Sequence, residues 1–241
     1  MSARAAPGQP CSRERAPGEP GAYTVYPSRD FPKGPPSRYM LLDEANWMGR
    51  QNMAIEVAAA RRLFTREEYH RMAEVGILKP ADRVELIRGE IVEMSPIGRR
   101  HYAFVNNLSH LLIMGLAGRA IVAVQGPIVL ADDTEPEPDL AVIRRRLPPY
   151  KDREAHTEDA FLLIEVAESS LAYDRSTKLR LYAAAGIPEY WVVDCVAESI
   201  GVYRTPHPDG YRDVARVAGP TARVVLQAFP DVALALTEIF A

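Results

Sequence analysis

The sequence predicts an α/β fold whose centre runs helix, three strands, helix, strand. Two kinds of pattern indicate it. Short runs of branched apolar residues are typical of buried strands, and longer stretches with apolar residues three or four positions apart are typical of helices. A β-hairpin precedes this centre and further strands follow it. The predicted fold is therefore an α/β centre with β additions at both ends.

The first 52 residues are rich in Pro, Gly, Arg and Ser and show no apolar periodicity. Such a segment cannot bury enough apolar surface to offset the entropy lost on ordering, so we expect it to be disordered. The composition changes at Met53, which we take as a candidate for the true start of translation. We divide the chain into an extension over residues 1–62, either disordered or misassigned, and a folded domain over residues 63–241.

The folded domain opens with a helix and a hairpin. Thr65 and Glu68 have the spacing of a capping box, which predicts a helix that begins after Thr65 and runs toward Gly76. Two short strands over 84–87 and 90–94 follow, joined by a tight Arg-Gly turn.

The predicted α/β centre begins at His101, from which apolar residues recur at helical spacing until Gly118, a residue suited to end a helix. Strands are predicted over 120–130, 139–143 and 161–167. These elements supply the first helix and the three strands of the centre.

Asp174 is placed to cap the second helix, which contains Lys178 and ends at Gly186. A buried strand follows over 190–194. Turn sequences then separate three more predicted strands, over 200–204, 211–217 and 222–227.

The composition narrows the functional class. With 47% hydrophobic and 25% charged residues, no apolar run near the roughly 18 residues of a membrane span and no secretory signal, we expect a cytoplasmic protein without a membrane segment. Cys11 and Cys195 show neither a C-x-x-C pair nor a zinc spacing. A net charge of −3 argues against coating nucleic acid through bulk electrostatics, so a polyanion must be held locally.

Two carboxylates are candidates for a metal site. Asp139 begins a strand behind Pro138, and Glu165 lies inside the next, apolar strand, where a carboxylate needs a partner. If these strands are neighbours, about 4.8 Å apart, both side chains can share a Mg²⁺ whose oxygen ligands lie at about 2.1 Å. The backbone carbonyl of Val166 is a third candidate ligand. The structural alternatives are a loop end at Asp139 and an ion pair of Glu165 with Lys178 or Arg175.

Several segments carry a family resemblance when taken together. They are Pro138-Asp139, 164–166, 174–178, 186–191, 84–89 and His101. In this combination the chain resembles the Uma2-like endonuclease family of the PD-(D/E)XK nuclease superfamily over residues 64–240. The resemblance implies a restriction-endonuclease-like core with a central mixed sheet, an N-terminal β-hairpin and additional C-terminal strands. It also implies metal-assisted hydrolysis of phosphodiesters.

The resemblance implies roles for three further residues. The superfamily motif places a lysine two residues after the second acid, but Ala167 occupies that position here. The resemblance implies that the lysine has moved to the following helix, where it corresponds to Lys178. Glu85 and His101 would support the cation or its water shell. Their structural alternatives are an ion pair across the hairpin for Glu85 and a helix cap for His101.

These observations lead to the hypothesis of a metal-dependent endonuclease acting on nucleic acid, with DNA favoured over RNA. Mg²⁺ or Mn²⁺ would be held by Asp139, Glu165 and the Val166 carbonyl, and Lys178 would stabilise charge on the phosphate. Two alternatives remain: a noncatalytic interaction module that keeps the nuclease fold, and a metal hydrolase of another phosphate ester. The protein could act as a monomer or as a homodimer, and the hypothesis is compatible with a homodimer. The choice between DNA and RNA, sequence preference, oligomeric state and biological pathway are left open.

Overall fold

The computed structural model describes residues 61–79, 81–147 and 149–241, and residues 58–241 form one compact unit. Except for its last two residues, the predicted extension over 1–62 lies outside the described residues, and the domain boundary before residue 63 stays a prediction. Within the described ranges, no helix has the length and apolar character needed to cross a membrane.

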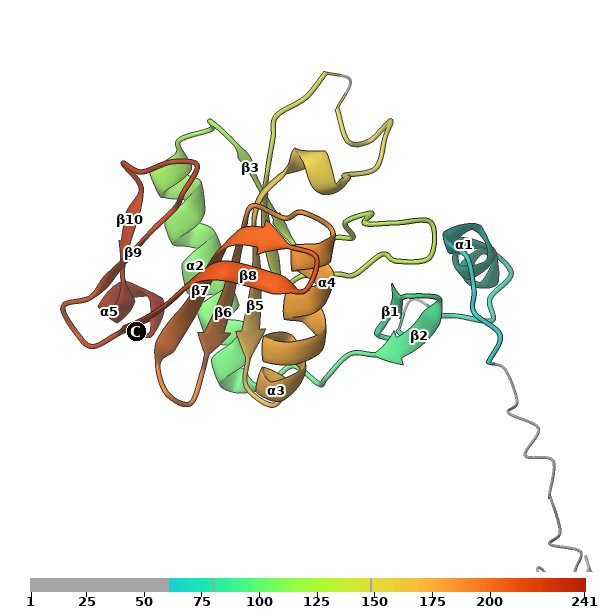
Figure 1. Ribbon diagram of the computed structural model, residues 1–241, viewed down its shortest axis with the longest axis horizontal. Helices are drawn as coiled ribbons and strands as arrows, with labels where there is room; N and C mark the ends of the chain where they lie inside the picture. Colours follow the sequence, from blue (N-terminus) through green and yellow to red (C-terminus); the bar gives the residue numbers. More distant parts are fainter. Residues whose placement is uncertain (1–60, 80, 148) are drawn as a thin grey trace, which may run out of the picture. The chain divides into compact units, whose positions relative to one another are not determined.

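A six-stranded mixed sheet forms the centre of the unit (Figure 1). Its strands, in spatial order, are β3 (Ile121–Val124), β4 (Leu140–Ile143), β5 (Ala160–Ala167), β6 (Glu189–Asp194), β7 (Ser199–His207) and β8 (Gly210–Ala218). Only β5 and β6 run parallel, and every other neighbouring pair in this sheet is antiparallel. A parallel pair needs a crossover connection, which here is helical. The predicted α/β class with a central mixed sheet is confirmed.

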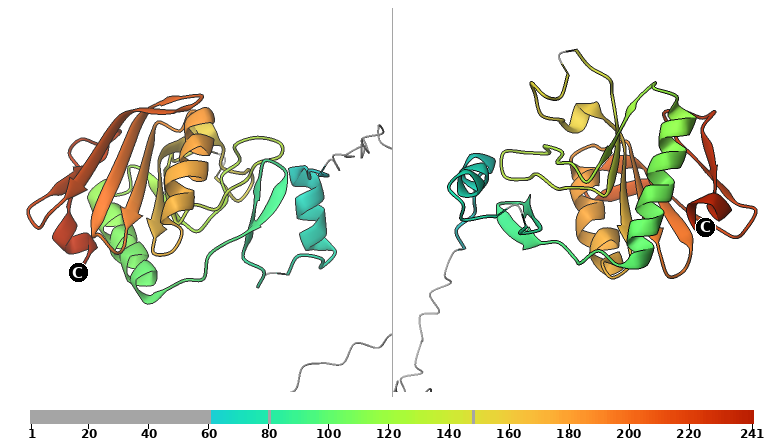
Figure 2. Two further views of the ribbon diagram at one scale, coloured as in Figure 1. Left: turned by 60° about the horizontal axis from the view of Figure 1, so that its bottom comes forward. Right: turned by 180° about the vertical axis from the view of Figure 1, so that it is seen from behind.

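Helices cover both faces of the sheet (Figure 2). Because successive side chains of a strand point to opposite faces, alternate residues of β5 enter two different cores. Ile164 packs with α2 (Arg99–Leu116), whereas Leu163 packs with the crossover helix on the other face. Burial on both faces explains why β5 is a nearly continuous apolar run.

The predicted helix and hairpin before the sheet are present. Helix α1 (Arg66–Glu74) begins with the Thr65 and Glu68 capping box. Strands β1 (Val84–Ile87) and β2 (Glu90–Glu93) pair antiparallel. Their turn residues Arg88 and Gly89 have φ angles of 51° and 77°, and a Cβ at Gly89 would lie 2.6 Å from the Leu63 Cβ. Glycine is therefore required at the second turn position.

The predicted strand over 120–130 is too long. Strand β3 ends at Val124, because Gln125 takes a left-handed φ of 49° and the chain turns through Gly126 and Pro127. The apolar residues after the turn belong to a loop that reaches back to the hairpin, where Leu86 and Glu135 exchange backbone hydrogen bonds.

The prediction that Asp174 caps the second helix is wrong. The helical segment begins three residues earlier with α3 (Leu171–Tyr173), continues as a π-helical turn, η3 (Asp174–Lys178), and ends with α4 (Leu179–Ala184). The Asp174 carboxylate accepts a hydrogen bond from the Ser170 hydroxyl at 2.5 Å, so this side chain turns back toward the start of the segment. The predicted stop is confirmed, since Gly186 follows with a φ of 78°.

The C-terminal region adds a second small sheet beyond β8. Its strands are β9 (Arg223–Val225) and β10 (Ala233–Ala235), and helix α5 (Leu236–Ile239) follows. Strand β9 is shorter than the predicted strand over 222–227. The helix end packs on α2 through the edge-to-face rings of Phe104 and Phe240. One further short helical turn, η2 (Thr157–Asp159), precedes β5.

Candidate metal centre

A cavity of about 330 Å³ lies between the β1–β2 hairpin, the first turn of α2, the ends of β4 and β5, and the helical segment 171–184. All five side chains predicted for the site line this cavity. They are Glu85, His101, Asp139, Glu165 and Lys178. Val166, whose carbonyl was predicted as a third ligand, lines the same cavity. Residues up to 93 positions apart in the sequence are thus brought together.

Asp139 is held in place from both of its oxygens. The pairing of Leu140 with Ile164 sets β4 beside β5, so the residue before Leu140 reaches the end of β5. Asp139 Oδ2 accepts a hydrogen bond from the Val166 amide at 2.9 Å, and Oδ1 lies 2.9 Å from His101 Nε2. The carboxylate is therefore fixed before any ligand arrives.

His101 does not cap its helix, because its side chain points to Asp139 instead. The first turn of α2 is tied to the end of β5 by Glu168, which accepts from the His101 amide at 3.3 Å. This helix start is crowded, since a Cβ at Gly98 would overlap the Glu168 carboxylate. Glycine at position 98 leaves room for the Glu168 carboxylate at the start of α2.

Glu165 lies on the face of β5 that meets the crossover helix. Its Oε1 accepts hydrogen bonds from Lys178 Nζ at 3.2 Å and from the Tyr182 hydroxyl at 2.7 Å. Its Oε2 accepts none from the residues that the structure describes. The predicted ion pair with Lys178 is present, whereas Arg175 pairs with Asp194.

Lys178 bridges the two glutamates of the site. Its Nζ lies 2.5 Å from Glu85 Oε2, so Glu85 pairs with the crossover helix and not across its own hairpin. Lys178 is the last residue of the π-helical turn, in which the Asp174 carbonyl accepts from the Leu179 amide. One extra residue in a turn rotates all later side chains by about 100° around the helix axis. This rotation sets the direction in which Lys178 and Tyr182, four residues apart, face Glu165.

Negative charge is in excess around the cavity. Burial raises the pKa of Glu165 to about 8; Lys178 opposes this rise, and three neighbouring carboxylates add to it. Burial also raises the pKa of Asp174 to about 6, against the hydrogen bond from Ser170. A site whose carboxylates resist ionisation gains from a bound cation, which favours their charged forms.

The donors suit a hard divalent cation. Carboxylate oxygens are the ligands that Mg²⁺ and Mn²⁺ prefer, and Asp139 and Glu165 supply them from adjacent strands. His101 Nδ1 gives a second indication: it is buried and has no hydrogen-bond partner in the described part of the chain. Buried polar atoms are rarely left unpaired, so Nδ1, on the side of the ring opposite to the Asp139 contact, calls for a water or ligand of its own. The residues present therefore fit a metal centre.

Two residues beside the predicted site were not predicted to belong to it: Asp174, which lines the cavity, and Tyr182, which lies behind Glu165. Asp174 was assigned only to a cap, and Tyr182 was taken only as part of the helix. The spacing of Asp174, Lys178 and Tyr182 at intervals of four residues marks one helix face and is the signal that would have found both.

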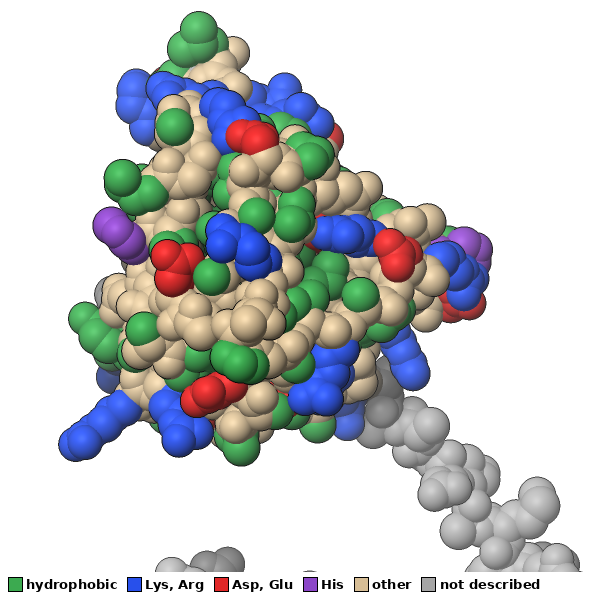
Figure 3. Space-filling model, turned by 90° about the vertical axis from the view of Figure 1, so that its left-hand side faces the viewer, with side chains coloured by type: hydrophobic (Ala, Val, Ile, Leu, Met, Phe, Trp, Pro, Cys, Tyr) green, Lys and Arg blue, Asp and Glu red, His purple; other side chains and the backbone are tan. Residues whose placement is uncertain are grey.

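The run of three arginines after β4 is engaged within the chain. Arg144 lies over the Phe161 ring at 4.4 Å, Arg145 donates to the Gly118 carbonyl at 2.9 Å, and Arg146 pairs with the buried Asp159. Figure 3 shows basic side chains gathered at the upper end of one face, the end that in Figure 1 carries the loop after β4. Helix α3, beside the cavity, lies at the opposite end of the unit in Figure 1. These arginines therefore stabilise the loop.

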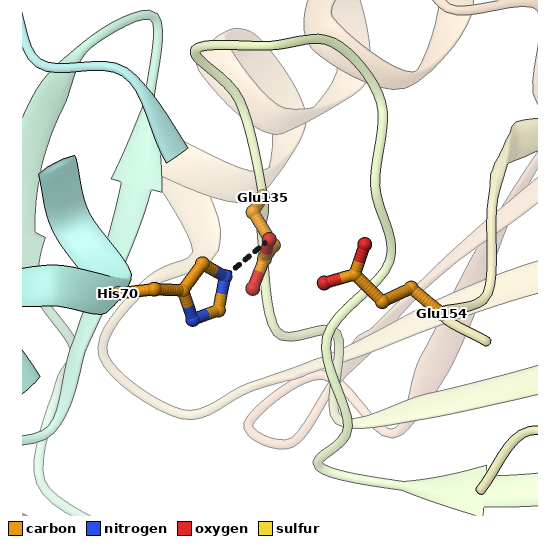
Figure 4. Close-up of side chains that lie close together, drawn as sticks. All are labelled: His70, Glu135 and Glu154. Atoms are coloured by element: carbon orange, nitrogen blue, oxygen red, sulfur yellow. Dashed lines mark hydrogen bonds and ion pairs between the residues drawn. The ribbon is translucent and has the colours of Figure 1, made fainter. Parts of the chain in front are cut away.

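A second group of potential ligands lies outside the cavity (Figure 4). His70, Glu135 and Glu154 place one ligand atom each within 4.8 Å of one another. Arg66, however, pairs with both Glu135 and Glu154. Because an arginine does not lose its proton, these carboxylates already have a permanent positive partner. In the cavity, by contrast, the single cation Lys178 is shared between Glu85 and Glu165.

Comparisons with known proteins agree with this fold. A family model, Uma2, described as "Putative restriction endonuclease", matches residues 66–237. A crystal structure from Anabaena variabilis ATCC 29413, described as a "putative nuclease belonging to DUF820", has a TM-score of 0.59 and 18% identity and covers 73% of this chain and 97% of that chain. At this identity the similarity shows the fold alone. No curated protein matches the chain.

The mixed sheet, the helices on both its faces and the structural match show that the chain has the same α/β fold as that "putative nuclease". Because the family model covers more than half of the sequence, the chain belongs to the Uma2 family. The predicted family resemblance is confirmed.

Proposed function

We propose that this protein is a metal-dependent endonuclease that hydrolyses phosphodiester bonds of nucleic acid, with DNA as the preferred substrate. The observation that carries the proposal is the cavity at the end of β5. There Asp139 and Glu165 come from adjacent strands, beside an unpaired His101 nitrogen and within reach of the Lys178 ammonium. Membership of a family described as "Putative restriction endonuclease" supports the same activity.

Asp139, Glu165 and the Val166 carbonyl are the residues that would hold Mg²⁺ or Mn²⁺. When bound, such an ion polarises the phosphate and lowers the pKa of a coordinated water. Asp139 needs little reorganisation for this task, because His101 and the Val166 amide already orient it. Preorganised ligands of this kind are what a catalytic electrostatic site requires.

Lys178 is the candidate for stabilising negative charge that develops on the phosphate. Its ammonium is held at the cavity wall by Glu85 and Glu165, so its position costs no reorganisation during the reaction. Glu85 would act through Lys178, and His101 through Asp139. The five predicted residues thus divide into two metal ligands, one cation and two supporting groups.

One observation favours the alternative of a noncatalytic interaction module. Lys178 already compensates Glu85 and Glu165, so this part of the site is stable as an ion-paired network without any metal. The alternative of a metal hydrolase acting on another phosphate ester shares the metal centre and differs only in substrate.

The test combines a Mn²⁺ titration by calorimetry with a substrate panel of plasmid DNA, structured RNA and a small phosphodiester. We expect Mn²⁺ binding and DNA cleavage by the full chain, and loss of both in Asp139→Asn and Glu165→Gln. Glu154→Gln is the matched control, because its arginine-paired group should not contribute. Absence of Mn²⁺ binding by the unmodified chain would favour the interaction module, and cleavage of the small ester alone would favour the other hydrolase.

A further inference from the structure

Tyr182 contacts the candidate metal centre from inside the protein. Its side chain is fully buried, and its hydroxyl donates to Glu165 Oε1 at 2.7 Å. The ring lies edge-to-face on Tyr190 at a centroid distance of 4.9 Å, and the Tyr190 hydroxyl donates to the Asp174 carbonyl at 3.1 Å. Tyr182 is therefore held rigidly between the sheet and the π-helical turn.

The geometry shows which donor determines the orientation of Glu165. Lys178 lies closer to Glu85, at 2.5 Å, than to Glu165, at 3.2 Å. Tyr182 makes the shorter of the two hydrogen bonds to Glu165 Oε1 and has no competing acceptor among the described residues. A phenol also has fewer rotatable bonds than a lysine, so it defines the position of its partner more sharply.

Glu165 has a second oxygen that remains available. Both donors bind Oε1, while Oε2 accepts no hydrogen bond from the described residues, and Glu165 lines the cavity. Among the fully buried side-chain polar atoms of the described residues, only His101 Nδ1 lacks a partner. Oε2 also has no partner in this part of the chain and is not one of these buried atoms, so it is not sealed in the core but open to the cavity. The cavity, which Asp139 also lines, therefore receives one free oxygen from Glu165.

We infer that Tyr182 is a positioning residue of the metal centre: its hydroxyl fixes Glu165 Oε1 so that Oε2 is presented to a divalent cation. The inference rests on the proposed function, because it assigns an orienting role to a partner of a proposed ligand. Groups that orient metal ligands in this way typically contribute about 10-fold to 100-fold to metal affinity.

The test is Tyr182→Phe in the full chain, which removes one oxygen and keeps the ring. The matched control is Tyr211→Phe. Tyr211 is also buried, belongs to the same aromatic group and donates its hydroxyl to the Ile187 carbonyl at 2.9 Å, but it does not reach Glu165. Both variants lose one buried hydrogen bond, so a purely structural role predicts similar losses of thermal stability and unchanged Mn²⁺ affinity in both.

We expect Tyr182→Phe to weaken Mn²⁺ binding at least about tenfold and Tyr211→Phe to leave it within about twofold. The Mn²⁺ concentration for half-maximal cleavage should rise by the same factor as the dissociation constant. Replacing Tyr182 by p-aminophenylalanine keeps a donor at the same place and should restore most of the affinity. This variant also provides the readout if the phenylalanine variant does not fold.

The outcomes separate the inference from the proposed function. If Glu165→Gln loses Mn²⁺ binding while Tyr182→Phe and Tyr211→Phe both keep it, the positioning role is overturned and the metal centre stands. If the p-aminophenylalanine variant binds no better than a folded Tyr182→Phe, the hydroxyl donor is not the cause and the inference also fails. If Glu165→Gln binds Mn²⁺ as well as the unmodified chain does, the metal centre itself is overturned, and the role of Tyr182 with it.

Discussion

Lys178 Nζ lies 2.5 Å from Glu85 Oε2, and each of these two side chains is only 4% exposed. The contact joins the β1–β2 hairpin to the helix that crosses between β5 and β6. Breaking a buried ion pair by removing one partner is far more costly than breaking an exposed one, because a charge is left uncompensated in a poorly solvated place.

The first prediction concerns this pair. Lys178→Met leaves Glu85 and Glu165 without a cation, so we expect it to lower the free energy of unfolding by about 3–5 kcal/mol in urea denaturation. Glu85→Gln should cost less, since Lys178 keeps Glu165 as a partner. The double variant Lys178→Met/Glu85→Gln should be more stable than Lys178→Met alone. Additive losses would show that the two side chains are not coupled.

Arg71→Met is the control for this experiment. Arg71 pairs with Glu74, but both side chains are largely exposed, so no measurable loss of stability is expected.

The second prediction concerns His101, which orients Asp139 through Nε2. We expect His101→Ala to weaken Mn²⁺ affinity about tenfold, as is typical when a group that orients a metal ligand is removed. His110→Ala is the matched control, because His110 lies on the exposed side of the same helix. Equal calorimetric affinities for the two variants would exclude a supporting role for His101.

The third prediction is a pH dependence of cation binding. Burial raises the pKa of Glu165 in the metal-free protein from 4.5 to about 8. Below this pH the site retains a proton that a cation must displace, so Mn²⁺ affinity should rise with pH by up to about tenfold per pH unit and level off above about pH 8. Calorimetry at pH 7 in buffers of different ionisation heat should detect proton release. Affinity that is constant between pH 6 and 8 would contradict the raised pKa.

Folding stability gives an independent check of the same pKa. Between pH 4.5 and 8 the native metal-free protein binds more protons at Glu165 than the unfolded chain does. Stability in this window therefore falls as pH rises, by the linkage relation. Glu165→Gln has no such proton, so its stability should depend less on pH in this window.

The individual site residues can be predicted from the sequence because each one has a local sequence feature that distinguishes it. Asp139 starts a strand behind a proline, and Glu165 interrupts an apolar strand, where a charge requires a partner. The family resemblance then singles out Lys178. Ala167, at the position of the motif lysine, is 1% exposed and belongs to the hydrophobic core on the face of the sheet that α4 covers, where a lysine would be buried.

The sequence does not predict the path of the chain between these residues. Asp174 is a good capping residue by type, and no local pattern marks the extra residue of the π-helical turn. The strand over 120–130 was predicted too long because apolar residues continue beyond Val124. These later residues pack as part of a loop, and their partners in that packing are distant in the sequence. Tertiary contacts therefore determine both the π-helical turn and the end of β3.

The last prediction separates Lys178 from the other lysine near this part of the sequence, Lys151. Lys178 is buried at the cavity wall beside Glu165, whereas Lys151 is largely exposed in the loop after β4 and pairs with its neighbour Asp152. Holding a flexible exposed side chain at a metal centre would cost ordering entropy, so only Lys178 is placed to meet charge on a phosphate. We expect Lys178→Ala to lower the cleavage rate at saturating Mn²⁺ by at least about tenfold, or about 1.4 kcal/mol of transition-state stabilisation. Lys151→Ala should have little effect.

Because Lys178→Ala also destabilises the fold, the rates must be compared at a temperature where circular dichroism shows both variants to be folded. Undiminished cleavage by folded Lys178→Ala would remove Lys178 from the catalytic residues and leave it as the cation of a buried structural ion pair.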